Sequence, residues 1–314
     1  MTSNSAAYWL GNKDNDQLQR VYGVSFPKHS QLTEYVKQQE ELARRNHRNI
    51  GQQQQLFSLS HMAAGSPIFL PHGTVLYNKL VELMRREYRL RGYQEVITPN
   101  LYHTELWKTS GHFFKYYDAM FFIKQGEEEL GIKPMNCPGH CLVFAQKQHS
   151  YRDLPIRYAD FGVLHRNELA GTLTGLTRVR RFQQDDAHIF CRPDQIRQEI
   201  MGVLDLIDYI YTLFGFTYRM ELSTRPEHYL GSAGQWDEAE QQLRDALEEF
   251  GKGYRVNEGD GAFYGPKIDL KLYDVFEREH QTATIQLDFQ LPARFNLQYR
   301  SQSPHEGAPS QQEE

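Results

Sequence analysis

The segment "RRFQQDDAHIFC", residues 180–191, combines residues typical of a buried strand with polar groups that such a strand normally excludes. Side chains alternate between the two faces of a strand, so one face carries the even-numbered residues: Phe182, Gln184, Asp186, His188 and Phe190. Successive groups on this face lie roughly 7 Å apart. An exposed polar strand is one explanation. The flanking phenylalanines favour a lined pocket instead, in which buried polar groups would need a ligand or metal as partner.

The overall composition is that of an ordinary globular protein. The chain has 314 residues, of which 39% are hydrophobic and 24% charged, enough for one large domain or two ordinary ones. The net charge of −5 gives no global sign of nucleic-acid or membrane binding, although a local basic face would suffice for nucleic acid. We find no apolar run of about 18 residues and therefore expect no membrane span.

Cysteine usage and the N-terminus indicate an intracellular protein. Three cysteines in a chain of this length argue against a disulfide framework and for a reducing compartment. The opening "MTSNSAAYWLGN" has neither the apolar core of a signal peptide nor an Arg-rich presequence. We therefore predict a cytoplasmic location, with a mitochondrial one left open.

Helices and strands are predicted to be interspersed along the chain. Leu32, Tyr35 and Val36 are spaced as in a helix over residues 30–46, with Ser30 as N-cap, and the glutamine-rich residues 51–55 suggest an exposed linker. The other expected elements are helices at 74–92 (ended by Gly92), 195–214 and 235–250, and strands at 93–99, 217–224, 263–274 and 282–291. The order lacks a regular βαβ rhythm, which favours an α+β fold with an antiparallel sheet flanked by helices.

The segment "KPMNCPGHC", residues 133–141, is a second cluster of chemically active groups. Pro138 suits the first position of a helix, which would put Cys137 at or near the N-cap. A thiol at a helix N-terminus is expected to have a lowered pKa and to be a better metal ligand or nucleophile. Cys137 and Cys141 are four residues apart, unlike the pair of a zinc knuckle, so a structural cysteine remains an alternative.

The segment "FGVLHRNELAGTLTGLTRVRRFQQDD" places a strand ending near Arg166 and Glu168 before a Gly/Thr-rich loop. Two residues apart on a strand, these side chains would share a face. Arginine suits bidentate phosphate binding, and glutamate can accept a hydrogen bond from an exocyclic amine. A surface ion pair is the alternative.

Taken in order, several segments resemble the threonyl-tRNA synthetase family of class II aminoacyl-tRNA synthetases. "GYQEVITP" resembles motif 1, "HRNE" with "GLTRVRRFQQDDAHIFC" resembles motif 2, and "MNCPGHC" resembles the metal-site segment. "LSTRPE", "GDGAFYGPKIDL" and "QTATIQLDFQLPARFNL" also match the catalytic domain of this family. The resemblance covers nearly all of residues 50–300.

The resemblance implies a domain organisation. Residues 51–300 would form the class II catalytic domain with motifs 1 and 2, residues 1–50 the end of an editing domain plus a linker helix, and residues 301–314 a disordered tail. Motif 3, the anticodon-binding domain and most of the editing domain find no counterpart. The expectation is therefore a chain truncated at both ends.

The resemblance also implies an activity. It is ATP-dependent activation of threonine and its transfer to tRNA(Thr) by a homodimer that uses Zn²⁺ and Mg²⁺. Cys137 and His188 match zinc ligands, and His305 lies near the position expected for a third. Zinc would hold the threonine amino and hydroxyl groups, and a site that binds a hydroxyl strongly rejects valine, which lacks one.

Individual roles follow from the matched positions. Asp186 would accept a hydrogen bond from the threonine hydroxyl, Arg166 would bind the α-phosphate, Glu168 would bind the adenine amine, and Phe182 would stack on adenine. The implied catalytic residues are Arg166, Gln184 and Lys267; the implied amino-acid pocket is Met135, Asp186, Tyr264, Gln281 and Gln286; the implied ATP site is Arg166, Glu168, Arg178, Val179, Phe182, Gln281 and Thr284.

Two points stay open. Gln281 and Gln286 are five residues apart and would face opposite ways on a regular strand, so we predict a bulge or turn near Ala283. A catalytically impaired synthetase-like protein that dimerises or binds a partner is the alternative to an active ligase. A class II enzyme for serine or proline is disfavoured by the cysteine–histidine pair and by Asp186.

Overall fold

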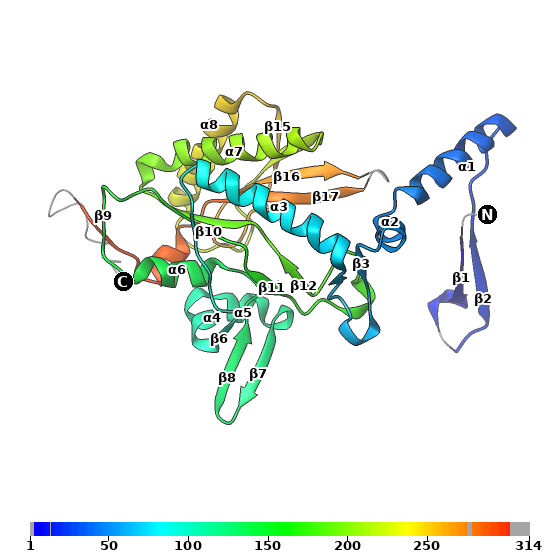
Figure 1. Cartoon of the computed structure of the whole chain (residues 1–314), viewed down its shortest axis with the longest axis horizontal. Helices are drawn as coiled ribbons and strands as arrows, with labels where there is room; N and C mark the ends of the chain where they lie inside the picture. Colours follow the sequence, from blue (N-terminus) through cyan, green and yellow to red (C-terminus); the bar gives the residue numbers. More distant parts are fainter. Residues whose placement is uncertain (1–2, 13, 275–277, 302–314) are drawn as a thin grey trace. The chain divides into compact units, whose positions relative to one another are not determined.

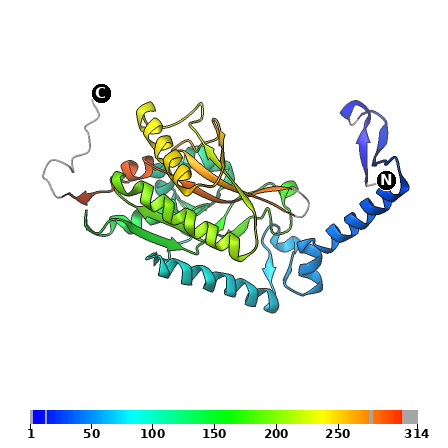
Figure 2. The same ribbon diagram turned by 90° about the horizontal axis from the view of Figure 1, so that it is seen from above.

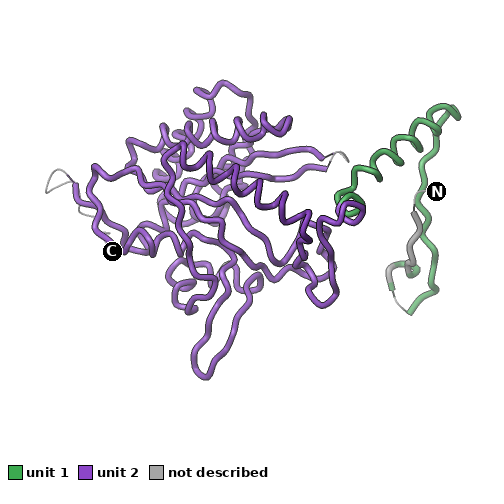
Figure 3. Tube along the Cα trace, viewed as in Figure 1, with its two compact units in different colours: residues 1–50 green, residues 51–314 purple. Residues whose placement is uncertain are grey.

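The computed structural model describes residues 3–12, 14–274 and 278–301 and divides into two compact units, residues 1–50 and 51–314 (Figure 3). In the first unit, β1 (Ser3–Tyr8) and β2 (Gln17–Tyr22) form an antiparallel hairpin that precedes α1 (His29–Arg44). The predicted N-cap was wrong. Ser30 lies inside α1, and Lys28 is the N-cap because the Gln31 side chain accepts a hydrogen bond from its backbone N–H.

The residues predicted as an exposed linker are in part helical. Helix α2 (His47–Gln53) extends over the first three of them, and Gly51 is buried because Phe57 packs closely against it. After α2 come the short strands β3 (Phe57–Ser58) and β4 (Ile68–Phe69), which pair with each other. Only the last part of the predicted linker is therefore outside a helix.

The largest sheet of the second unit has four strands. Its strands lie in the order β15 (Tyr254–Asn257), β14 (Tyr218–Ser223), β16 (Lys267–Tyr273) and β17 (Glu279–Gln286), and only β14 and β15 run parallel. Apolar side chains alternate with polar ones along β14 and β16. The apolar face packs against α7 (Ile196–Leu213) and α8 (Ala233–Phe250), which lie together beside the sheet (Figures 1 and 2). The polar face is left for other contacts.

A smaller sheet lies in the order β13 (Asp186–Phe190), β10 (Ile156–Asp160) and β5 (Gln94–Glu95). Strand β10 is antiparallel to β13 and parallel to β5. Helix α3 (Pro71–Leu90) leads into β5 and starts three residues before the predicted helix. Gly92, at φ +77°, follows its end as predicted, since glycine tolerates this left-handed conformation.

The remaining elements surround these sheets. Strands β6 (Leu101–His103), β8 (Glu128–Ile132) and β7 (Phe121–Gln125) form a third sheet beside α4 (Thr104–Ser110) and α5 (His112–Tyr116). β11 (Val163–His165) pairs with β12 (Arg181–Gln183), and β9 (His149–Ser150) pairs with β18 (Tyr299–Arg300). Helices α6 (Cys137–Ala145) and α9 (Gln290–Arg294) complete the unit.

The α+β fold class is confirmed, with mainly antiparallel pairing, but four predicted strands were clearly too long. The strand expected over 263–274 begins only at Lys267, as β16. The strand expected over 93–99 is reduced to β5. Residues 180–191 form two strands, β12 and β13, which pair with different partners on either side of Gln184 and Asp185. The strand expected over 282–291 ends at Gln286, before α9. Nearly all of the predicted tail, including His305, lies outside the described residues.

Within the part of the chain that the structure describes, none of the helices combines the length and the apolar character needed to cross a membrane.

Candidate active site

The first polar groups of the candidate site lie at the start of α6. The helix begins at Cys137, has Pro138 in its first turn and is capped by Asn136, which confirms the predicted position of Cys137 to within one residue. Asn136 is fully buried, and its amide nitrogen donates to Oδ2 of Asp186 at 3.0 Å. The carboxylate on β13 is thereby tied to the residue that precedes α6.

The polar face of β13, which strand alternation predicted, lies against α6. Asp186, His188 and Phe190 all point to this side, where Phe190 stacks on Phe144 with ring centroids 4.5 Å apart. The intervening side chains of β13 pack into the core on the other side. The three groups therefore line a partly enclosed space, with the Asp186 and His188 side chains 23% and 24% exposed.

His188 is held through one ring nitrogen. Its Nδ1 lies 2.6 Å from Nδ1 of His140, and Nε2 of His140 lies 3.6 Å from Oδ2 of Asp160. Asp160 is buried and accepts a hydrogen bond from the Thr98 hydroxyl at 2.7 Å. Burial lowers the pKa of His188 to about 4, so its ring is neutral at pH 7, which is the form that binds metals.

The pKa of Cys137 contradicts the sequence-based expectation. Burial raises the pKa of this thiol well above its usual value, and the carboxylates of Asp186 and Asp288 add to the rise. These effects outweigh the helix N-terminus, so the free thiol is protonated. Among residues 3–12, 14–274 and 278–301 there is no group of three or more His, Cys, Asp or Glu side chains that could hold a metal ion. Cys137 and His188 supply two donors of the kinds that zinc prefers.

Strands β11 and β12 contribute the arginine-rich side of the site. The Arg166 guanidinium lies over the ring of Phe182, 5.1 Å from its centroid, and Nε donates to the carbonyl of Pro134 at 3.3 Å. Glu168 lies beyond the end of β11, so strand alternation does not determine which way it points. Its carboxylate accepts from Nε of Arg178 at 2.9 Å across the loop. The ion pair here is thus between Glu168 and Arg178, and not between Glu168 and Arg166.

Strand β17 contributes the opposite side and contains a bulge. Leu270 lies opposite Ala283, whereas the next residue of β16, Lys271, lies opposite Gln281, so Thr282 has no partner in the register. This confirms the predicted irregularity near Ala283. The extra residue turns Gln281 onto the same face as Thr284 and Gln286.

The bulge brings three predicted site residues onto one face. Gln281 and Thr284 both donate to Oδ1 of Asp269, at 2.7 and 3.0 Å. Gln286 accepts a hydrogen bond from the Tyr264 hydroxyl at 2.6 Å. The two glutamines that a regular strand would separate therefore belong to one surface.

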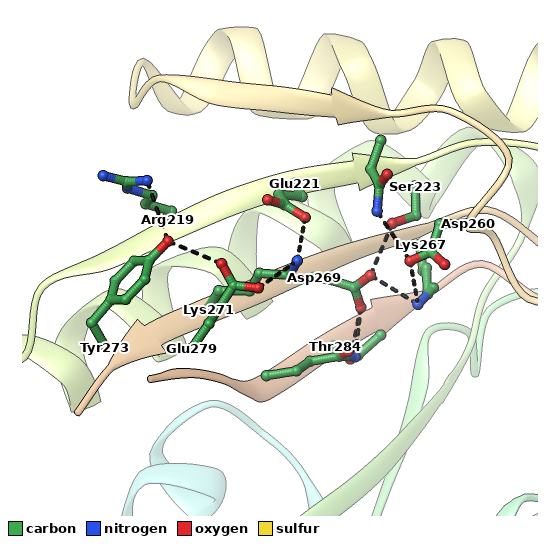
Figure 4. Close-up of polar contacts among 12 residues, drawn as sticks. Arg219, Glu221, Ser223, Asp260, Lys267, Asp269, Lys271, Tyr273, Glu279 and Thr284 are labelled. Carbon is green, nitrogen blue, oxygen red and sulfur yellow. Dashed lines mark hydrogen bonds and ion pairs between the residues drawn. The ribbon is translucent and has the colours of Figure 1, made fainter. Parts of the chain in front are cut away.

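Lys267 lies on the same surface, as Figure 4 shows. Its ammonium is 2.8 Å from Oδ2 of Asp269 and 3.7 Å from Oδ2 of Asp260. The lysine side chain is only 14% exposed. It is therefore held in place by carboxylates on two segments.

Electrostatic coupling links this surface to the start of α6. Burial raises the pKa of Tyr264, and Cys137 and then Asp288 raise it further. Asp288 follows β17, and burial raises its own pKa to about 6. Tyr264 and Asp288 thus lie near Cys137, which joins the two sides of the site.

The other predicted residues are less closely tied to this group. Gln184 is exposed in the link between β12 and β13, and Met135 and Val179 are half-buried. Sequence reasoning missed the residues that hold the site together: Asn136, His140, Asp160 and Asp269. Two of these carried a signal, since His140 is one helical turn after Cys137 and Asp269 is two strand positions after Lys267.

A separate open hollow of about 940 Å³ lies between α3 and α7. Its arginines are paired with carboxylates, as in the contacts of Arg91 with Glu87 at 2.6 Å and of Arg157 with Glu199 at 2.6 Å. It contains none of the predicted site residues.

Comparisons with known proteins agree with the fold. Residues 117–310 match the model of the tRNA synthetase class II core domain (G, H, P, S and T). The chain therefore belongs to the class II tRNA synthetase core-domain family.

Within this family the similarity is to the threonine enzymes. The chain is 57% identical over 301 residues to a probable cytoplasmic threonine–tRNA ligase of Dictyostelium discoideum, covering 96% of the chain and 42% of the relative. It is 57% identical over 298 residues to a mitochondrial threonine–tRNA ligase of Arabidopsis thaliana, covering 95% and 42%.

A crystal structure described as the RNA binding domain of threonyl-tRNA synthetase from Cryptosporidium parvum matches with a TM-score of 0.81 and 56% identity. The match covers 84% of this chain and 66% of that one. The resemblance identified from the sequence is thus confirmed, and the chain spans about 42% of the length of the curated relatives.

Proposed function

We propose that this chain carries the catalytic core of a threonine–tRNA ligase, which activates threonine with ATP and transfers it to tRNA(Thr). The observation that supports this most is the grouping of residues from three separate motifs around the start of α6. Asp186 is bonded to Asn136 there, His188 is held by His140, and Tyr264 lies near Cys137.

The amino acid would bind at the α6 side. Asp186 accepts a hydrogen bond from the threonine hydroxyl, and its tie to Asn136 holds the carboxylate ready for this contact. Because valine has no hydroxyl, its binding would leave the Asp186 carboxylate without that donor, which costs affinity. Tyr264, bonded to Gln286, would close the pocket from the β17 side, with Met135 beside it.

This side of the site would supply some of the ligands of a zinc ion. Cys137 and His188 would hold it, with a further ligand from outside the described residues. Bound zinc would supply a Lewis acid for the amino and hydroxyl groups of threonine. Because Nδ1 of His188 is occupied by His140, its Nε2 is the nitrogen left for the metal. The protonated Cys137 thiol would have to lose its proton on binding, which makes zinc affinity rise with pH. Cys137→Ser should abolish zinc retention, measured as zinc content by atomic absorption.

ATP would bind at the β11–β12 side. Arg166 would contact the α-phosphate, while Phe182 would stack on adenine with the ring face that Arg166 leaves open. Glu168 would accept from the adenine amine, and Arg178, with the neighbouring Val179, would line the rest of the nucleotide site. The attacking carboxylate and the phosphate are both anionic, so cationic groups must align them and neutralise charge. Lys267, Gln281 and Thr284 would line this reaction centre from the sheet, with Gln184 nearby, and Mg²⁺ would neutralise negative charge on the phosphates.

A homodimer is part of the proposal. Helix α3 and the segments before it expose apolar side chains, with exposed fractions of 60% for Val75, 53% for Leu76, 51% for Leu80 and 87% for Met62. A second copy of the chain would cover this surface. Residues 1–50 would correspond to the end of an editing domain with a linker helix, and a cytoplasmic location is proposed.

The test is threonine-dependent ATP–pyrophosphate exchange by the 314-residue chain, with zinc quantified in the same sample. We expect exchange with threonine well above a valine control. A folded, zinc-loaded chain that shows no exchange would contradict catalytic competence and favour a role as a binding partner.

A further inference from the structure

Asp269 occupies the centre of the polar face of β16 and is almost fully buried, with 1% exposure. Four donors surround its two oxygens. Oδ1 accepts from Gln281 and Thr284, and Oδ2 accepts from the Ser223 hydroxyl at 2.9 Å and pairs with Lys267 at 2.8 Å. An ionised carboxylate can accept this many hydrogen bonds, so the buried charge is fully compensated.

The partners of Asp269 come from three strands. Ser223 ends β14, Lys267 begins β16, and Thr284 lies on the neighbouring β17 (Figure 4). Gln281 and Thr284 lie on either side of the bulge in β17. Without the bulge, Gln281 and Thr284 would face opposite ways, because they are three residues apart. The bulge therefore converges both side chains on one carboxylate.

This arrangement fixes the orientation of the Gln281 amide. Its nitrogen Nε2 donates to Asp269 at 2.7 Å and lies 2.6 Å from Oγ1 of Thr284. Both of these contacts use the nitrogen end, so the carbonyl oxygen is the end left for a ligand. The same carboxylate holds the Lys267 ammonium. One buried group therefore orients both the Gln281 carbonyl oxygen, which is a hydrogen-bond acceptor, and the Lys267 cation.

We propose that Asp269 is the positioning residue of the sheet side of the site, holding Lys267 and orienting Gln281 and Thr284 before substrate binds. It would not touch substrate and would act through these three residues. The assignment of the three to a substrate site rests on the proposed function, whereas their attachment to Asp269 does not.

Asp269→Asn provides a direct test because it keeps the shape of the side chain. An amide cannot satisfy the donors on both sides. If its oxygen stays with Gln281, its NH₂ group faces the Lys267 ammonium; if it flips, its NH₂ group faces Nε2 of Gln281 and forces that amide to turn. The matched control is Glu221→Gln. Glu221 lies directly opposite Asp269 on β14, has 13% of its side chain exposed and pairs with Lys271.

The first readout needs no ligand. The side-chain NH₂ resonances of Gln281 can be assigned by their loss in Gln281→Met. In Asp269→Asn, either these resonances should shift or the Lys267 ammonium signal should be lost. Neither signal should change in Glu221→Gln. Unchanged Gln281 and Lys267 signals in a folded Asp269→Asn chain would overturn the inference.

The second readout is calorimetric binding of a nonhydrolysable threonyl-adenylate analogue to the same chains. Asp269→Asn should weaken binding by about 10- to 100-fold, as expected for a small misplacement of site groups, while Glu221→Gln should bind like the unaltered chain. Equal losses in both variants would contradict a specific role for Asp269. If the unaltered chain does not bind the analogue, the proposed function fails, and the resonance shifts still decide whether Asp269 positions its neighbours.

Discussion

The two sides of the candidate site are built differently. On the β11–β12 side, the ion pair of Arg178 and Glu168 is partly open to solvent, with the two side chains 58% and 23% exposed. On the β16–β17 side, Lys267 is paired with a carboxylate that is 1% exposed and that bonds three other side chains. The sheet side is therefore organised before any ligand arrives, whereas single contacts near the surface hold the arginine side. Substitutions on the sheet side should alter both stability and binding, and those on the arginine side mainly binding.

The largest expected effect on stability comes from the apolar face behind Asp269. Leu270→Ala removes a fully buried side chain from the core between β16, α7 and α8 and should lower the free energy of unfolding by about 2–5 kcal/mol. Urea denaturation would measure this. Ile97→Ala, at a side chain that is 91% exposed, is the control and should change little. Similar losses for both variants would show that the sheet is not the stable part of the unit.

Arg166→Ala addresses the arginine side. The Arg166 side chain donates one hydrogen bond, to a carbonyl, and covers one ring, so the melting temperature should change little. Threonine-dependent pyrophosphate exchange should fall roughly 10²- to 10³-fold, as when one transition-state donor is removed. Arg85→Ala, which breaks an exposed pair with Glu95, is the matched control. Undiminished pyrophosphate exchange in Arg166→Ala would contradict the assignment of Arg166 to the ATP site.

The pH dependence of stability can be tested at His112, which belongs to neither side of the candidate site. Burial and the nearby Arg294 lower the pKa of His112 to about 4. The unfolded chain, with an ordinary histidine pKa near 6.5, then binds more protons than the folded one between these values, so stability falls as the pH drops below about 6.5. From pH 7 to pH 5 this group should account for about 2 kcal/mol of lost stability. Unfolding of His112→Gln at both pH values should show a smaller loss, and an identical loss would contradict the burial of this ring.

The smallest expected effect on stability belongs to the exposed ion pair. Arg178→Ala should change the free energy of unfolding by less than about 1 kcal/mol, because solvent screens this pair. Affinity for ATP should fall about tenfold if the arginine contacts the nucleotide. Calorimetric titration with ATP would measure this loss of affinity. A large loss of stability would mean that the two sides are built alike.

Local pattern predicted much of this fold. Helices with long apolar stripes, such as α7 and α8, appear where the sequence placed them, and the alternation along β13 placed Asp186 and His188 on one face. The irregularity found at Thr282 was predicted by combining two facts: the family resemblance assigns Gln281 and Gln286 to one pocket, and their spacing would separate them on a regular strand. For the helices and for β13, neighbouring residues alone carried the information.

The other features of the fold and of the site depend on tertiary contacts, which local sequence patterns do not predict. Residues 180–191 have strand character throughout, but β12 and β13 pair with different strands, which no local pattern encodes. The pKa of Cys137 rises because tertiary packing buries the thiol, and carboxylates distant in sequence add to the rise, against the effect of its own helix. Likewise, Asp269 is two positions from Lys267, yet only the packing of three strands shows that it bonds Gln281 and Thr284.

The most direct test of the account is calorimetric binding of nonhydrolysable threonyl- and valyl-adenylate analogues to the 314-residue chain, with and without Asp186→Ala. We predict that the threonyl analogue binds at least about 100-fold more tightly, since the site offers a hydrogen-bond partner to a hydroxyl. Asp186→Ala should remove most of this difference. Equal binding of the two analogues by the unaltered chain would contradict the assignment of this site to threonine.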